Sequence, residues 1–174
     1  MRIISGKYRG KSLLYPKDPA LRPTQDRVKE AMFGIVQFQV PDAVVLDLFC
    51  GTGSLGIEAL SRGASHAVFV DKETKILSEN LKKIDGSFKV FRSESYRFLK
   101  KNDRVFDLIF IDPPYERHDL YEETLNHIFE FGMLKSTGIA LCEHHRAYKI
   151  ASLFPHITSS EHSYGDTKLT LFKV

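Results

Sequence analysis

The chain has 174 residues, of which 43% are hydrophobic and 27% charged, and its formal net charge is +3. This size and composition predict one globular domain, or one domain with a short extension, and exclude a disordered or fibrous chain. No apolar run approaches the about 20 residues of a membrane span, and no apolar leader precedes the fold. The two cysteines, Cys50 and Cys142, are too few for a disulfide framework. We therefore expect a cytoplasmic protein without a membrane contact or a bound metal.

The positive charge is concentrated at the N-terminus. Residues 1–30 carry eight Lys and Arg against three Asp and Glu, whereas the remainder of the chain carries 17 against 19. Because the neutralisation of phosphates supplies much of the affinity for nucleic acids, this asymmetry favours contact with a polyanion. A basic surface that faces only water would have the same composition.

The first 42 residues predict a basic extension made of a β-hairpin and a helix. The expected segments are strands 2–5 and 12–15, their turn 6–10, a break at 16–19, and a helix that begins near Thr24 or Asp26. The apolar face of that helix is expected to be Val28, Met32, Ile35 and Val36. Pro41 and Asp42 close the extension.

Strands and helices alternate in residues 43–174, which predicts a parallel sheet with helices on both faces. The expected strands are 44–49, 67–71, 88–91, 106–111 and 138–143, and the expected helices are 54–62, one around 77–84, 96–100, and one around 121–129. Segments 157–164 and 168–174 flank the turn 165–167 and predict an antiparallel hairpin. The fold class is therefore α/β and Rossmann-like, with a mostly parallel seven-stranded sheet that ends in an antiparallel hairpin.

A glycine-rich turn joins the first strand of this domain to its helix. Gly51, Gly53 and Gly56 fit the pattern G-x-G-x-x-G, and Asp71 ends the second strand. Glycines let a ligand approach the main chain closely, and an acid at the second strand tip can bind ribose hydroxyls. By itself, this pattern is typical of a nicotinamide or flavin cofactor.

Asp47, at the end of the first strand, favours a different cofactor. A carboxylate near the glycine turn would repel a pyrophosphate, whereas it would attract the ammonium or sulfonium group of S-adenosylmethionine. Glu94 and Ser95 follow the third strand, where an adenine ring would reach; Glu94 could accept a hydrogen bond from its amino group or simply meet a helix dipole. The expected cofactor-binding residues are Asp47, Cys50, Gly51, Thr52, Gly53, Leu55, Asp71, Lys72, Glu94 and Ser95.

The residues predicted to be catalytic follow the fourth strand and are Asp112, Pro113, Pro114 and Tyr115. Two consecutive prolines cannot continue a central strand because they lack amide donors, so the chain must leave the sheet at Asp112. Asp112 and the Pro113 carbonyl can accept the N–H groups of an exocyclic amine and direct its lone pair at a methyl group. Tyr115 can stack on an extruded or single-stranded base. This tetrapeptide resembles motif IV of the amino-methyltransferases.

Motifs along the whole chain resemble the RsmD family of bacterial 16S rRNA guanine-N2 methyltransferases. The matching segments, besides the glycine turn and the tetrapeptide, are residues 1–10, 22–31, 55–64 and 164–167. The resemblance implies a class I S-adenosylmethionine-dependent fold and methylation of a guanine N2 in 16S rRNA. It implies RNA contact by the extension 1–42, with Arg22, Thr24 and Arg27 as the candidate residues.

The expected partner is 16S rRNA or the small ribosomal subunit, with the assembled particle as the favoured substrate, and we expect a monomer. Three other functions stay open on the residues alone. An adenine-N6 methyltransferase acting on DNA or RNA would use the same tetrapeptide. A nicotinamide-dependent oxidoreductase would use the glycine turn, and a catalytically silent RNA-binding protein would need only the basic extension.

Overall fold

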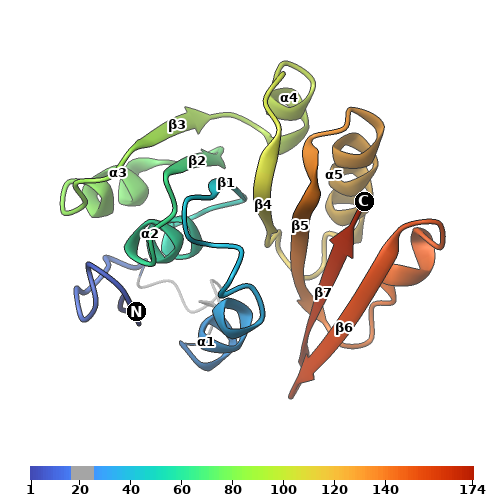
Figure 1. The fold of residues 1–174 in the computed structure, drawn as a ribbon, viewed down its shortest axis with the longest axis horizontal. Helices are drawn as coiled ribbons and strands as arrows, with labels where there is room; N and C mark the ends of the chain where they lie inside the picture. The colour runs from blue at the N-terminus through green and yellow to red at the C-terminus, as the bar shows by residue number, and fades with distance from the viewer. Residues whose placement is uncertain (17–25) are drawn as a thin grey trace.

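The structure is a computed structural model that describes residues 1–16 and 26–174 (Figure 1). The strands are β1 (Val44–Leu48), β2 (His66–Asp71), β3 (Phe88–Arg92), β4 (Phe106–Ile111), β5 (Leu134–His145), β6 (Thr158–Tyr164) and β7 (Thr167–Lys173). The helices are α1 (Asp26–Ile35), α2 (Ser54–Ser61), α3 (Lys75–Leu81), α4 (Ser95–Leu99), α5 (His118–Glu130) and the 3₁₀ helix η1 (Ile150–Leu153).

All seven strands belong to one sheet, in the order β3-β2-β1-β4-β5-β7-β6. The strands from β1 to β5 pair in parallel, and β7 is antiparallel to both β5 and β6. The predicted α/β sheet with a C-terminal antiparallel hairpin is therefore confirmed. The central strands β1 and β4 are almost fully buried, whereas the edge strands β3 and β6 are mostly exposed.

Helices cover both faces of the sheet because its central strands carry apolar side chains on both sides. The helices α4, α5 and η1 pack on the face that carries Leu46 and Ile109. The opposite face, which carries Val45 and Phe110, is covered by α1 and α2, and α3 continues this cover over β2. Helix α1 thus shares a core with β1 and β4, although it belongs to the predicted extension.

The N-terminal hairpin is smaller than predicted. Instead of two strands, it has one antiparallel bridge, between Arg2 and Ser12. The reason is that the amides of Ile4 and Ser5 donate to a side-chain carboxylate and not to a partner strand. Residues 17–19 of the predicted break at 16–19 and the alternative helix start at Thr24 lie outside the described residues, and α1 begins at Asp26.

The structure also extends the prediction in three places. Strand β5 begins at Leu134 and ends at His145, because it pairs with β4 from Phe106 onward and with β7 up to Thr167. The helix η1 was not predicted. On α1, Lys29 and Phe33 are buried along with Val28 and Met32, Val36 is buried just beyond the end of the helix, and Ile35 is partly exposed.

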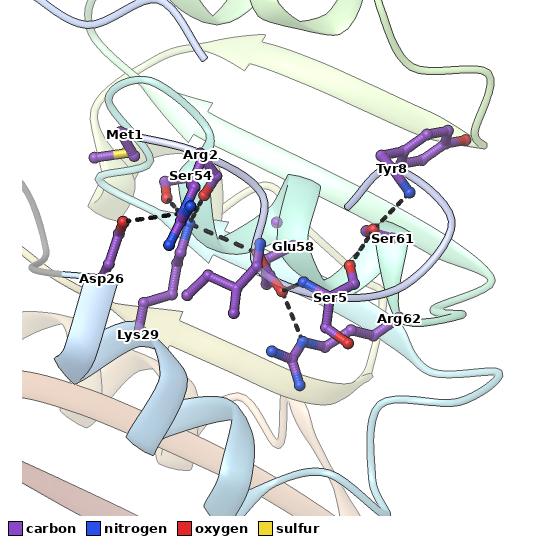
Figure 2. A network of polar contacts seen from close by, with 12 residues as sticks. Met1, Arg2, Ser5, Tyr8, Asp26, Lys29, Ser54, Glu58, Ser61 and Arg62 are labelled. Carbon is purple, nitrogen blue, oxygen red and sulfur yellow. Dashed lines mark hydrogen bonds and ion pairs between the residues drawn. The ribbon is translucent and has the colours of Figure 1, made fainter. Parts of the chain in front are cut away.

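The carboxylate of Glu58, on α2, holds the N-terminal segment against the domain (Figure 2). Its Oε2 accepts the amide of Ile4 at 2.8 Å, and its Oε1 accepts the amide of Ser5 at 3.0 Å and the Arg62 Nε at 2.8 Å. Glu58 itself is 0% exposed. Burial of a carboxylate costs desolvation free energy unless the group is paired and hydrogen-bonded. The hydrogen bonds from these donors offset that cost for Glu58.

Lys29 connects α1 to the same network (Figure 2). Its side chain is fully buried, and its Nζ lies 3.6 Å from Glu58 Oε2. The Nζ also donates to the Arg2 carbonyl at 2.7 Å and to Ser54 Oγ at 3.1 Å. Burial lowers the pKa of Lys29, and the charge of Glu58 opposes part of this effect. One ammonium group therefore links α1, the N-terminal segment and the start of α2.

We expect Glu58→Ala to lower the free energy of unfolding by about 3–5 kcal/mol, because it leaves the buried Lys29 charge without its counter-ion. Lys29→Met should cost less, since Glu58 keeps Arg62 and two amides. Urea unfolding measures both effects, and hydrogen exchange should show that the Ile4 and Ser5 amides lose protection in Glu58→Ala.

The matched control is Glu79→Ala, which removes an exposed partner of Lys82 at 2.7 Å and should cost less than about 1 kcal/mol. If the Ile4 and Ser5 amides kept their protection in Glu58→Ala, the role given to this carboxylate would be wrong.

Candidate active site

The parallel strands bring the predicted cofactor and catalytic residues to one edge of the sheet. Leu48, near the end of β1, pairs with Val70 of β2 on one side and with Ile111 of β4 on the other. The glycine turn and the tetrapeptide therefore start at the same level on neighbouring strands. The strand order reverses between β1 and β4, which is the position where open α/β sheets bind ligands.

The three glycines of the turn serve different purposes. A Cβ on Gly53 would lie 2.4 Å from Leu77, and a Cβ on Gly56 would lie 2.3 Å from the Phe69 ring. These two glycines let α2 pack closely against its neighbours. Gly51 has φ +51°, and nothing lies within 4 Å of its Cβ position. Its main chain is the part of the turn left open to a ligand.

Asp71 fixes the glycine turn from the tip of β2. Its Oδ2 accepts the Gly51 amide at 2.8 Å, and its Oδ1 accepts the Glu73 amide at 3.0 Å. Each carboxylate oxygen has a further lone pair. Asp71 can therefore hold the turn and still accept hydrogen bonds from two ribose hydroxyls.

Asp47 is a buried carboxyl group beneath the turn. It is 1% exposed, and its Oδ2 accepts the Gly56 amide at 2.8 Å. Burial raises its pKa to about 7, and the nearby charge of Asp71 adds to the rise. A cationic ligand would stabilise the ionised form and lower this pKa. The site is thus arranged to bind a positive group more readily than a phosphate.

Glu94 and Lys72 come together from the ends of β3 and β2. Lys72 Nζ lies 2.9 Å from Glu94 Oε1, and Arg97 Nε lies 3.1 Å from Glu94 Oε2. These two cations lower the pKa of Glu94. Its side chain makes no capping hydrogen bond to the start of α4, and its carboxylate lies between Lys72 at the β2 tip and Arg97 on α4. Ser95, the first residue of α4, is buried.

The side chains of Cys50 and Leu55 are buried in apolar clusters. Burial raises the pKa of the Cys50 thiol well above its usual value, which does not suit a nucleophile. The Thr52 carbonyl accepts a hydrogen bond from Asn80 Nδ2 at 3.0 Å, and the same Nδ2 donates to Leu14 O at 3.1 Å. Asn80, which sequence reasoning missed, thereby ties the turn to the N-terminal segment.

The corner from Asp112 to Tyr115 leaves β4 as predicted. Asp112 and Tyr115 are half-buried, Pro113 is buried and Pro114 is exposed. The Tyr115 hydroxyl donates to Glu143 Oε1 at 2.9 Å and lies 3.1 Å from Thr167 Oγ1. Burial and the charge of Glu143 raise the pKa of Tyr115, so the phenol stays neutral.

Tyr121 supports the same corner from α5, and sequence reasoning missed this role. Its fully buried hydroxyl lies 2.7 Å from the Glu143 carbonyl and 3.2 Å from the Pro113 carbonyl. Its single proton favours the nearer carbonyl, so the Pro113 oxygen keeps the capacity to accept an N–H group. The missed signal was a tyrosine on an otherwise apolar helix face, because a buried phenol needs a partner.

Phe49 is a further residue that the sequence did not single out. It has φ +60° at the end of β1, a left-handed conformation that is uncommon for a bulky side chain. Such strain persists where the surrounding structure enforces it, and it is often found at functional sites. Here the sharp turn at Phe49 directs the chain into the glycine turn.

The RNA-contact residues are placed only in part. Arg27 is exposed on α1, whereas Arg22 and Thr24 lie outside the described residues.

Within residues 1–16 and 26–174, no group of three or more His, Cys, Asp or Glu could hold a metal ion, and Cys50 and Cys142 are free buried thiols. None of the helices in this part of the chain combines the length and apolar character needed to cross a bilayer.

The sheet order, the glycine turn after β1 and the antiparallel β7 define a class I methyltransferase fold. The family described as "Conserved hypothetical protein 95" matches residues 1–173, and the chain belongs to it. Ribosomal RNA small subunit methyltransferase D of Escherichia coli K12 is 36% identical over 147 residues, which are 82% of this chain and 74% of that protein. This similarity confirms the resemblance to the RsmD family.

Two further comparisons cover nearly the whole chain. The protein YlbH of Bacillus subtilis is 36% identical over 182 residues, which span 99% of this chain and 98% of YlbH. The solved structure of the protein YhhF from Escherichia coli superposes with a TM-score of 0.88 at 32% identity. That superposition covers 99% of this chain and 96% of YhhF.

We expect Asp47→Asn to stabilise the ligand-free protein at pH 8 and to weaken the binding of S-adenosylhomocysteine. The carboxyl group has a pKa of about 7 in the folded state against an ordinary value of 3.8. The protonated Asp47 carboxyl therefore contributes most to the free energy of unfolding below pH 3.8. This contribution is lost as the pH rises from 3.8 to 7, and the loss amounts to up to about 4 kcal/mol. The gain from Asn should therefore be largest above pH 7.

Urea unfolding at pH 5 and pH 8 measures the stability change, and calorimetry measures the affinity. A variant that is less stable than the wild type at pH 8 would contradict the cost assigned to the buried charge.

Proposed function

We propose that the protein transfers the methyl group of S-adenosylmethionine to the exocyclic N2 of a guanine in 16S rRNA. The observation that carries the proposal is the position of Asp112 and Pro113, which directly follow β4, while the glycine turn follows β1, the strand that pairs with β4. The family relationship supports it, because relatives in Escherichia coli and Haemophilus influenzae are named ribosomal RNA small subunit methyltransferase D.

The residues at the tips of β1, β2 and β3 fit a cationic methyl donor. The charge of Asp47 would attract the ammonium group of the methyl donor, and the open main chain at Gly51 would lie against the donor. Asp71 would accept hydrogen bonds from the ribose hydroxyls. Glu94 and the main chain of Ser95 bind the adenine. When bound there, S-adenosylmethionine supplies a methyl group activated by a sulfonium.

The corner after β4 binds the base. Asp112 and the Pro113 carbonyl accept the two N–H groups of the guanine amine, whose lone pair is otherwise delocalised into the ring. The amine nitrogen can then become more tetrahedral and direct its lone pair at the methyl group. Asp112 is also the carboxylate that can accept the proton that this nitrogen loses. Catalysis therefore rests on alignment and on charges placed in advance.

Tyr115 stacks on the extruded base, and the residues behind it keep the ring in place. Its hydroxyl is held by Glu143 and Thr167, so little side-chain freedom is lost when the base arrives. The Tyr121 hydroxyl donates to the Glu143 carbonyl and lies 3.2 Å from the Pro113 carbonyl. This arrangement makes the corner rigid, which suits a reaction that depends on alignment.

We expect Asp112→Ala to abolish methyl transfer while the affinity for S-adenosylhomocysteine stays near that of the wild type. The reason is that Asp112 contacts the base and not the cofactor. Asp119→Ala, an exposed acid at the start of the neighbouring helix α5, is the matched control and should transfer methyl groups normally.

Transfer of labelled methyl groups to 16S rRNA and mass spectrometry of the product nucleosides measure the outcome. Undiminished transfer by Asp112→Ala would contradict the proposed role. N6-methyladenosine in place of N2-methylguanosine would identify an adenine methyltransferase, and tight binding of NAD without S-adenosylhomocysteine would identify an oxidoreductase.

We also propose that the substrate is the assembled small subunit and that the enzyme acts in the cytoplasm as a monomer, with residues 1–42 as its RNA-contacting extension. The seven-stranded sheet with its helices takes up most of the 174 residues, so we expect the assembled particle to present the base. Methyl transfer should therefore be faster on 30S subunits than on naked 16S rRNA. Equal initial rates on the two substrates would refute this preference.

A further inference from the structure

A basic hollow of about 350 Å³ lies between the N-terminal segment and the end of α3. We call it the lysine hollow; it is lined by Ile84 and by the polar residues Lys7, Lys11, Lys82, Lys83, Tyr8 and Asp85. Four ammonium groups therefore face one carboxylate. The residues come from two segments about 70 positions apart, so only the fold assembles this charge.

The ring of Tyr8 lies at the base of the hollow, and the ammonium groups of Lys7 and Lys11 lie over it. Lys7 Nζ lies 5.3 Å from the centroid of this ring, and Lys11 Nζ lies 5.0 Å from it. The Tyr8 hydroxyl donates to Asp85 Oδ1, and Lys7 Nζ lies 2.6 Å from the same oxygen. Asp85 thus holds both the Tyr8 ring and the Lys7 ammonium group in place.

The two segments are also joined by the lysines themselves. Lys11 Nζ donates to the Lys83 carbonyl at 2.8 Å, and Lys83 Nζ donates to the Ser12 carbonyl at 3.2 Å. Because an ammonium group has three N–H donors, each of these lysines can still donate to a ligand. Lys82 has an exposed side chain that pairs with Glu79, a contact that a phosphate could replace.

The main chain beneath the hollow is held firmly at the C-terminal end of α2. Gly6 has φ +82°, and a Cβ on it would lie 1.7 Å from the Ser61 carbonyl oxygen. The amide of Lys7 donates to that carbonyl at 2.7 Å, and the amide of Tyr8 donates to Ser61 Oγ at 2.9 Å. The lysines are therefore presented from a fixed backbone.

The hollow lies away from the edge that carries Asp47 and Asp112. Helix α3 begins at Lys75, shortly after β2 ends at Asp71, and it ends at Leu81, directly before Lys82. The seven residues of α3 span about 10 Å, and Lys82 and Lys83 follow the end of this helix that lies away from the tip of β2. A polymer with a negative charge at every residue can contact both places at once.

We propose that the lysine hollow binds backbone phosphates of the substrate RNA, on nucleotides that flank the methylated base. This inference rests on the proposed function, because the RNA is the molecule whose base enters the site at Asp112. Contacts of this kind do not read the sequence, and they set the register of the RNA on the protein.

The test is the double variant Lys82→Gln/Lys83→Gln, which removes two charges and keeps side chains that can donate hydrogen bonds. The matched control is Lys100→Gln/Lys101→Gln, an exposed lysine pair that directly follows α4. Binding to 16S rRNA and to 30S subunits is measured by filter binding at several salt concentrations. Thermal unfolding and the affinity for S-adenosylhomocysteine show whether the fold and the cofactor site are intact.

We expect the Lys82/Lys83 variant to bind RNA at least about fivefold more weakly and to lose roughly 1 to 2 from the slope of log affinity against log salt. The Lys100/Lys101 variant should match the wild type. A Lys82/Lys83 variant with the affinity and salt slope of the wild type would overturn the inference, even if methyl transfer to RNA were demonstrated. Lysine-dependent RNA binding without any methyl transfer would support the hollow and refute the proposed function.

Discussion

The parallel pairing of β1 with both β2 and β4 is the constraint on which the rest of the structure depends. It places the ends of these strands at one level, so that the turn at Gly51, the carboxylate of Asp71 and the corner at Asp112 meet at one edge. The pairing requires two buried faces, and the helices on both sides provide them. The position of the chemistry is therefore a consequence of how the sheet buries its apolar side chains.

The buried carboxylates of Glu58 and Asp47 have different consequences for the stability of the protein. Glu58 accepts hydrogen bonds from Ile4, Ser5 and Arg62 and lies beside Lys29, so its burial holds the molecule together. Asp47 accepts the Gly56 amide, and burial raises its pKa to about 7. Its charge is costly in the ligand-free protein and becomes useful when a cation binds. The network at Glu58 fastens the same N-terminal segment that carries part of the lysine hollow.

Periodicity and turn chemistry predicted the strands of the sheet, the C-terminal hairpin and the position of each motif, because these are local properties of the chain. They could not predict that the amides of Ile4 and Ser5 would turn from a strand partner to Glu58, which is more than fifty residues away. They also missed the support that Tyr121 gives to the proline corner after β4. A buried side chain shows its polar partner only when the elements are packed together.

The sequence by itself determined the α/β fold class, the glycine turn, the carboxylates at the strand tips and the proline corner at Asp112. Each of these follows from backbone stereochemistry or from charge within a few residues. Only the tertiary structure decided that Lys72 pairs with Glu94, that Glu143 and Thr167 hold Tyr115, and that lysines about 70 positions apart share one hollow. Those contacts depend on which elements the sheet brings together, and a single sequence does not record the distance between its own distant residues.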